Sequence, residues 1–125
     1  MADARATLDK AMSEAELWGA VKDYLLTFGW MFYHCRPAQN RGGKWITPLE
    51  GWAGFPDVVA VKDGRLLFIE LKSQRGSLTE PQIQWLRVLD SAGGESHTPY
   101  GAKVYVWRPS DMSSGEVERV LGDSG

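Results

Sequence analysis

The sequence contains little cysteine and no long apolar run, and both absences narrow the possible classes of protein. A single cysteine among 125 residues excludes an intrachain disulfide and a cysteine-rich zinc site. No segment approaches the roughly 18 apolar residues that a membrane span needs. The first dozen residues mix acidic and basic side chains without an apolar core, which is untypical of a secretory signal. We therefore expect a cytoplasmic protein with no membrane partner.

The length and composition are those of one folded unit. Hydrophobic residues make up 43% and charged residues 24%, which is ordinary for a globular protein. A chain of 125 residues leaves little room for two cores. We expect one domain over 1–125, with a flexible terminus at 1–12.

The charge is unevenly distributed although the net charge is only −2. Residues 34–76 hold seven basic and four acidic residues, whereas the rest of the chain holds seven basic and twelve acidic residues. Local potential matters more than total charge for binding a polyanion. The basic middle third is therefore compatible with nucleic acid as a partner, or with ordinary solvated charges.

The order of helix and strand signals predicts a mixed α/β domain. Ser13 followed by Glu16, and Thr79 followed by Gln82, have the pattern of capping boxes that begin helices. Residues 37–55 are rich in glycine, proline and tryptophan and lack a period, so we expect a long functional loop. The expected elements are a helix over 13–27, strands over 30–36, 57–61 and 66–72, a helix from 79 to about 93, a strand over 103–107 and a short helix over 113–121.

Asp63-Gly64 is a strong signal for a tight hairpin turn between two of these strands. With this turn, the register places Asp57 directly opposite Glu70, and strand alternation puts Lys72 on the same face as Glu70. Two carboxylates about 5 Å apart repel by roughly 3 kcal/mol at an effective dielectric near 20. Either Lys72 pairs with one of them, or a divalent cation lies between them.

Glu14 adds a third carboxylate near the start of the first long helix. In helical projection it points with the apolar residues Trp18, Val21 and Leu25. An acidic residue on an inward face indicates a partner there, unless it only interacts favourably with the helix dipole.

These residues resemble the motif of the PD-(D/E)xK nucleases, here Pro56-Asp57 and Glu70-Leu71-Lys72. Within that superfamily the chain is similar to the VRR-NUC family over about 13–111. The resemblance implies a restriction-endonuclease-like core, a small mixed β-sheet flanked by helices in the order α-β-β-β-α-β with a short C-terminal helix. It also implies dependence on Mg²⁺ or Mn²⁺, and a bacterial or phage-infected cell as the setting. Stand-alone members are similar to Holliday-junction resolvases and act as homodimers, whereas larger relatives repair interstrand crosslinks and prefer flaps.

The resemblance assigns roles to individual residues. Asp57, Glu70 and the backbone carbonyl of Leu71 would bind the metal, with Glu14 reaching it directly or through water. Lys72 would position or activate the attacking water. Gln82 would orient Lys72 or the phosphate, or would serve only as the third residue of its capping box.

Basic and aromatic residues of the middle third are candidates for DNA contacts. The tryptophans would stack on unpaired bases or open a junction, or they would pack on the core. These candidates are Arg36, Arg41, Lys44, Trp45, Trp52 and Arg75.

We expect a metal-dependent endonuclease for branched DNA, with a four-way junction as the first substrate to test and a role in recombination or repair. One alternative is a flap, nick or restriction-type DNA nuclease with the same chemistry. The other is a catalytically silent DNA-binding domain of the same fold.

Overall fold

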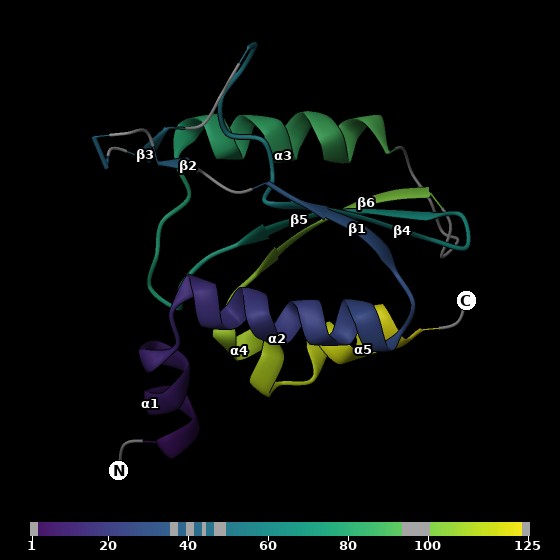
Figure 1. Ribbon diagram of the computed structural model, residues 1–125. Coiled ribbons are helices and arrows are strands. Elements are labelled where there is room, and N and C mark those ends of the chain that lie inside the picture. The colour runs from purple at the N-terminus through teal and green to yellow at the C-terminus, as the bar shows by residue number, and fades with distance from the viewer. Residues whose placement is uncertain are drawn as a thin grey trace.

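A computed structural model describes residues 3–35, 38–39, 42–43, 45–46, 50–93 and 101–123. It contains a four-stranded sheet between two layers of helices (Figure 1). The elements in chain order are α1 (Ala4–Ala11), α2 (Glu14–Thr27), β1 (Met31–His34), β2 (Ala38–Gln39), β3 (Trp45–Ile46), β4 (Val58–Lys62), β5 (Arg65–Leu71), α3 (Glu80–Ala92), β6 (Gly101–Trp107), α4 (Pro109–Ser113) and α5 (Glu116–Gly122).

The sheet is mixed and has the strand order β1-β4-β5-β6. The first two pairings are antiparallel, and β6 pairs with β5 in parallel. A parallel pair needs a crossover connection, which α3 supplies across one face of the sheet. The opposite face is covered by α2, α4 and α5 (Figure 1). This arrangement confirms the predicted mixed α/β class and is consistent with a small restriction-endonuclease-like core.

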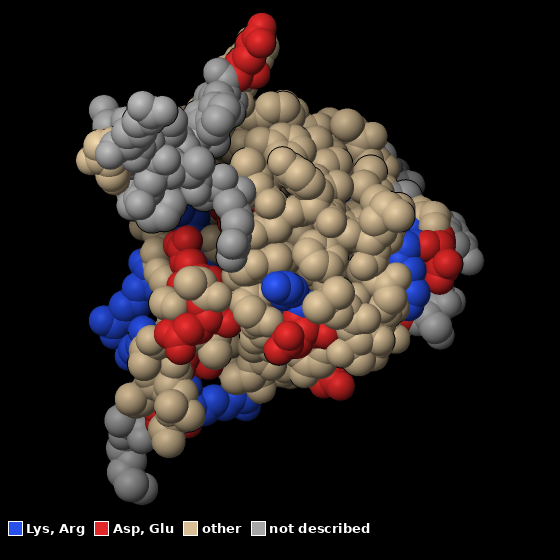
Figure 2. Space-filling view, in the orientation of Figure 1, with Lys and Arg blue, Asp and Glu red and all other residues tan. Residues whose placement is uncertain are grey.

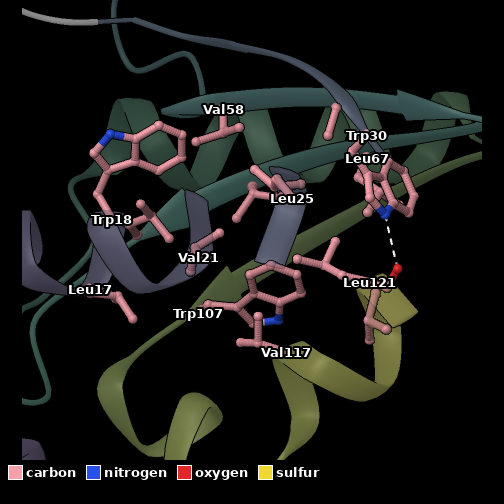
Figure 3. Packing of buried hydrophobic residues seen from close by; sticks show 14 residues of the cluster. Leu17, Trp18, Val21, Leu25, Trp30, Val58, Leu67, Trp107, Val117 and Leu121 are labelled. Atoms are coloured by element: carbon pink, nitrogen blue, oxygen red, sulfur yellow. Dashed lines mark hydrogen bonds between the residues drawn. The ribbon is translucent and has the colours of Figure 1, made fainter. Parts of the chain in front are cut away.

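The main hydrophobic core lies between the sheet and the layer of α2 and α5. Leu17, Val21 and Leu25 of α2 are fully buried against residues such as Leu67 of β5. Trp30 closes one end of this core, and its indole Nε1 donates to the carbonyl oxygen of Leu121 at 2.9 Å (Figure 3). The core thus fixes α2 on the sheet.

The predicted helix starts and hairpin turn are confirmed. Ser13 and Glu16 form a complete capping box at α2, and Thr79 and Gln82 form one at α3. Asp63 and Gly64 both have positive φ, 48° and 79°, as a type I′ turn requires. The first long helix begins and ends as its sequence pattern predicts.

Three features differ from the sequence-based expectation. Residues 4–11 form helix α1, because Asp3 caps its first turn and Ser113 of α4 donates to Asp9. The 37–55 segment contains the short pair β2–β3. The C-terminal region forms two helices, α4 and α5, and Gly115 at φ 86° separates them.

Arg65 belongs to the basic middle third of the sequence, but its side chain is buried and only 7% exposed. Its guanidinium donates to the carbonyl oxygens of Val120 and Asp123 and lies 4.9 Å from the centre of the Trp30 ring. This arginine therefore holds the C-terminal end of α5 and is unavailable to a polyanion.

Figure 2 shows acidic side chains grouped on the side of the molecule where α2 begins, with basic side chains beside them. Much of the remaining face in this view carries no charged side chain. Within the described ranges, no helix combines the length and apolar character needed to cross a membrane.

Candidate active site

The β4–β5 hairpin brings two carboxylates together at one end of the sheet. The observed register pairs Val58 with Ile69 and Lys62 with Arg65, as the position of the turn predicts. Asp57 lies one residue before β4, and its Oδ2 accepts a hydrogen bond from the backbone N–H of Leu71 at 2.8 Å. The Asp57 side chain is therefore fixed beside the end of β5 that carries Glu70.

The backbone of Asp57 is held from the other side as well. Its carbonyl oxygen accepts from the N–H of Cys35, which directly follows β1, at 3.0 Å. His34, the residue before Cys35, stacks on Trp18 of α2, with ring centres 4.0 Å apart. Three strands and α2 thus contribute to the position of this aspartate.

Glu70 is a buried carboxyl with incomplete hydrogen bonding. It is only 1% exposed, and its Oε1 accepts from Nε2 of Gln82 at 3.3 Å. Its Oε2 is buried and has no hydrogen-bond partner among the described residues. A buried, unpaired carboxylate oxygen is costly unless a cation or a proton compensates it.

The surroundings of Glu70 favour its neutral form in the protein alone. Burial raises the pKa of Glu70 to about 9, and the neighbouring Asp57 carboxylate raises this pKa further. The charge of Lys72 lowers this pKa, and the charge of Glu14 raises it further. Asp57, Lys72 and Glu14 therefore all act electrostatically on one carboxyl.

Lys72 directly follows β5 and is half-buried. Its backbone N–H donates to the carbonyl oxygen of Trp107, which extends the pairing with β6 by one residue. Among the described residues, Lys72 forms no ion pair with Asp57 or Glu70, and the ion pair that is present joins Arg119 to Glu116. The geometry therefore does not favour the interpretation in which Lys72 simply pairs with one acid.

Gln82 serves in its capping box, one of the two predicted alternatives, and its other contact is to Glu70 rather than to Lys72. Its Oε1 accepts from the backbone N–H of Thr79 at 2.9 Å and completes the capping box. Its Nε2 donates to Glu70. One amide therefore links the start of α3 to the buried carboxyl.

Glu14 lies in the first turn of α2 and is exposed. Its interaction with Glu70 acts through charge rather than through a hydrogen bond among the described residues. Glu14 is therefore at the rim of the cluster, whereas Asp57 and Glu70 are at its centre.

The residues present fit a divalent cation bound by few protein ligands. No group of three or more His, Cys, Asp and Glu side chains close enough to hold a metal occurs within the described ranges. Mg²⁺, however, commonly uses one or two carboxylates and keeps several waters. The unpaired Oε2 of Glu70 beside Asp57 is the observation that fits such an ion.

The predicted DNA-binding residues are only partly described. Trp52 is 75% exposed, and Arg75 is exposed in the turn after Lys72. The side chain of Trp45 and all of Arg36, Arg41 and Lys44 lie outside the described residues. A DNA-binding role for these six residues stays a prediction.

Sequence reasoning missed Arg108, which directly follows β6. Its guanidinium donates to the carbonyl oxygens of Ser73 and Gly76 and so holds the turn after Lys72. The sequence contains no short signal for this contact, because it depends on the parallel pairing of β5 with β6.

The open mixed sheet with helices on both faces is consistent with a small restriction-endonuclease-like core. The VRR-NUC domain model matches residues 32–103, more than half of the chain, and the chain belongs to this family of nuclease domains. A nuclease domain implies DNA as its substrate. The matched range contains Asp57, Glu70 and Lys72, and Glu14 lies outside it. Neither a curated protein nor a solved structure shows significant similarity to the chain.

Proposed function

We propose that this protein is a divalent-metal-dependent, structure-specific DNA endonuclease that hydrolyses phosphodiester bonds. The observation that carries the proposal is the buried Glu70 carboxyl with an unpaired Oε2 next to Asp57. Family membership supports nuclease chemistry, and the paired carboxylates support Mg²⁺ or Mn²⁺ as the cofactor.

Asp57, Glu70 and the carbonyl of Leu71 would hold the ion, and Glu14 would bind it through water at the rim. Bound there, a divalent cation supplies charge neutralisation for the phosphate and makes a bound water more acidic. Asp57 is oriented by the Leu71 N–H, and Glu70 is oriented by Gln82. These two contacts fix the carboxylates before DNA arrives, which limits reorganisation during the reaction.

Lys72 would place its ammonium group against the scissile phosphate or the attacking water. It directly follows the strand that carries Glu70, and its charge acts on that carboxyl. No carboxylate among the described residues neutralises it in an ion pair, so its positive charge is available to a phosphate oxygen.

For the substrate we propose branched DNA, with cleavage of a four-way junction by a homodimer as the leading version. A junction has two-fold character, and paired cuts need two sites, which a symmetric dimer provides. The alternative is a flap, nick or restriction-type substrate for the same site. The exposed Trp52, five residues before Asp57 in the chain, is compatible with DNA that contains unpaired bases.

The test is a cleavage panel of four-way junction, flap, nicked and linear duplex DNA with Mg²⁺ or Mn²⁺. Paired cuts in the junction, together with a dimer in sedimentation, are the expected result. Cleavage of flaps or linear DNA without cleavage of the junction would instead support the flap, nick or restriction-type alternative. A monomer of 13.9 kDa at the assay concentration would contradict the resolvase version.

A catalytically silent domain of the same fold is the remaining possibility. Such a domain gains nothing from burying a carboxyl beside a second one, because this arrangement costs stability. Calorimetry that shows no Mn²⁺ binding by the folded protein, together with no cleavage of any substrate, would favour it.

A further inference from the structure

A small apolar pocket lies on the outer side of α3, away from the main core. Among the described residues it is lined by Trp52, Gln84, Trp85 and Val88, and its volume is about 210 Å³. The side chains of Trp52 and Val88 at its rim are exposed. A large aromatic ring left in solvent beside a hollow marks a candidate site for recognition.

The pocket walls are fixed by contacts that do not depend on a ligand. The indole N–H of Trp85 donates to the backbone carbonyl of Trp52 at 3.2 Å. Phe55 meets Trp85 and Phe68 edge to face, with ring centres 5.0 Å and 5.9 Å apart. An aromatic cluster therefore connects the pocket through Phe68 to β5, the strand that carries Glu70.

Trp52 of the pocket and Asp57 of the candidate active site lie on one short chain segment. Gly54 lies between Trp52 and Asp57 with φ +97°, and it contacts the first turn of α3. A Cβ atom at this position would lie 2.5 Å from the carbonyl carbon of Pro81 and 2.8 Å from the backbone nitrogen of Gln82. Because Gln82 also donates to Glu70, the close approach at Gly54 ties the segment that carries Trp52 to the turn of α3 that contacts the candidate active site.

We propose that this pocket takes one unpaired base of the DNA strand, stacked against Trp52. This inference rests on the proposed nuclease function and specifies its substrate class. A volume of about 210 Å³ lies below the roughly 300–1,000 Å³ of pockets for drug-sized ligands, and so suits a single ring system. The amide of Gln84 can both donate to and accept from a base edge.

One basic residue of α3, Arg87, lies beside the pocket, and two acidic residues of the same helix, Glu80 and Asp90, lie near that arginine. Arg87 is exposed and lines an adjoining hollow with Gln84 and Val88, and it forms no ion pair with a described residue. A base in the pocket would leave its phosphate within the field of this arginine. Duplex DNA keeps its base faces stacked, so this occupant favours DNA with unpaired nucleotides, such as the flap of the alternative substrate, over a fully paired four-way junction.

The test measures binding without cleavage, in EDTA, by fluorescence anisotropy. The probes are a blunt duplex, the same duplex with a single-stranded tail, and a third with abasic nucleotides in the tail. The proteins are wild type, Trp52→Ala, Trp52→Phe and Leu26→Ala. Leu26 is an exposed apolar residue of α2, on the opposite face of the sheet, and is the matched control.

Wild type and Leu26→Ala should bind the tailed duplex more tightly than the blunt one. Loss of one stacked base by alanine substitution should reduce this advantage roughly 5- to 150-fold, and Trp52→Phe should keep most of it. The abasic tail should remove the advantage for wild type. Equal affinities of wild type and Trp52→Ala for the tailed duplex, or no preference for the tail in wild type, would overturn the proposal.

A parallel cleavage assay separates this proposal from the proposed function. A protein that prefers the tail through Trp52 but cuts no DNA with Mg²⁺ or Mn²⁺ keeps the pocket and loses the nuclease activity. A protein that cuts DNA but shows no effect of Trp52→Ala on tail binding keeps the nuclease activity and loses the pocket.

Discussion

Replacing Glu70 by glutamine removes an ionisable group that the fold buries next to Asp57. In the metal-free protein the pKa of Glu70 is raised from 4.5 to about 9, chiefly by burial. Between these two pH values the folded state keeps the proton and the unfolded state releases it. The free energy of unfolding should therefore fall as pH rises from about 4.5 to about 9.

The size of this effect follows from the pKa difference. Each pH unit in that interval costs about 1.4 kcal/mol of stability. At pH 7 the total is roughly 3 kcal/mol, which for a domain of this size corresponds to roughly 10 °C in the melting temperature. Glutamine is neutral in both states and still offers Gln82 an oxygen acceptor. Glu70→Gln should therefore be more stable than wild type at pH 7 and of similar stability at pH 4.

Urea unfolding in EDTA at several pH values between 4 and 9 measures this difference. Glu50→Gln is the matched control, because it makes the same substitution at an exposed glutamate. Parallel profiles for wild type and Glu70→Gln would show that burial does not raise the pKa of Glu70. That result would remove the electrostatic basis of the site.

Three further predictions follow from other contacts. Mn²⁺ at 100 times its Kd should stabilise wild type by about 2.7 kcal/mol in thermal unfolding and should have no such effect on Asp57→Ala. Gly54→Ala should be less stable than Gly51→Ala by about 1–3 kcal/mol in urea, because both positions have positive φ but only the first contacts α3; equal losses would refute this. Arg65→Met should lower the free energy of unfolding by about 3 kcal/mol, because the two hydrogen bonds from Arg65 to the end of α5 disappear. Arg119→Ala, which removes an exposed ion pair, should change this free energy little. Similar losses in the two variants would contradict the stabilising role of the buried arginine.

The hairpin and its two carboxylates could be predicted because their signals are local. Asp63-Gly64 fixes the turn, and the two-residue period of the strands then fixes which side chains meet. The same locality explains why the starts of α2 and α3 are where the capping residues predict them. The register of one hairpin therefore brings Asp57 next to Glu70 before any tertiary contact is considered.

Contacts between distant segments could not be predicted in this way. Arg65 belongs by sequence to a basic region, but its burial depends on α5, more than fifty residues later. The bond from Trp85 to the carbonyl of Trp52 depends on how α3 crosses the sheet. The unpaired oxygen of Glu70 is also a property of packing, because the sequence gives no account of which donors α3 brings to that face.

The most direct test of the account is single-turnover DNA cleavage by wild type, Asp57→Ala and Lys72→Ala, each with Mg²⁺, with Mn²⁺ and with EDTA. Mn²⁺ binding to the same proteins is measured by calorimetry. We predict metal-dependent cleavage by wild type alone, with Mn²⁺ binding lost in Asp57→Ala and kept in Lys72→Ala. Cleavage that persists in EDTA, or that survives both substitutions, would contradict the assignment of this site.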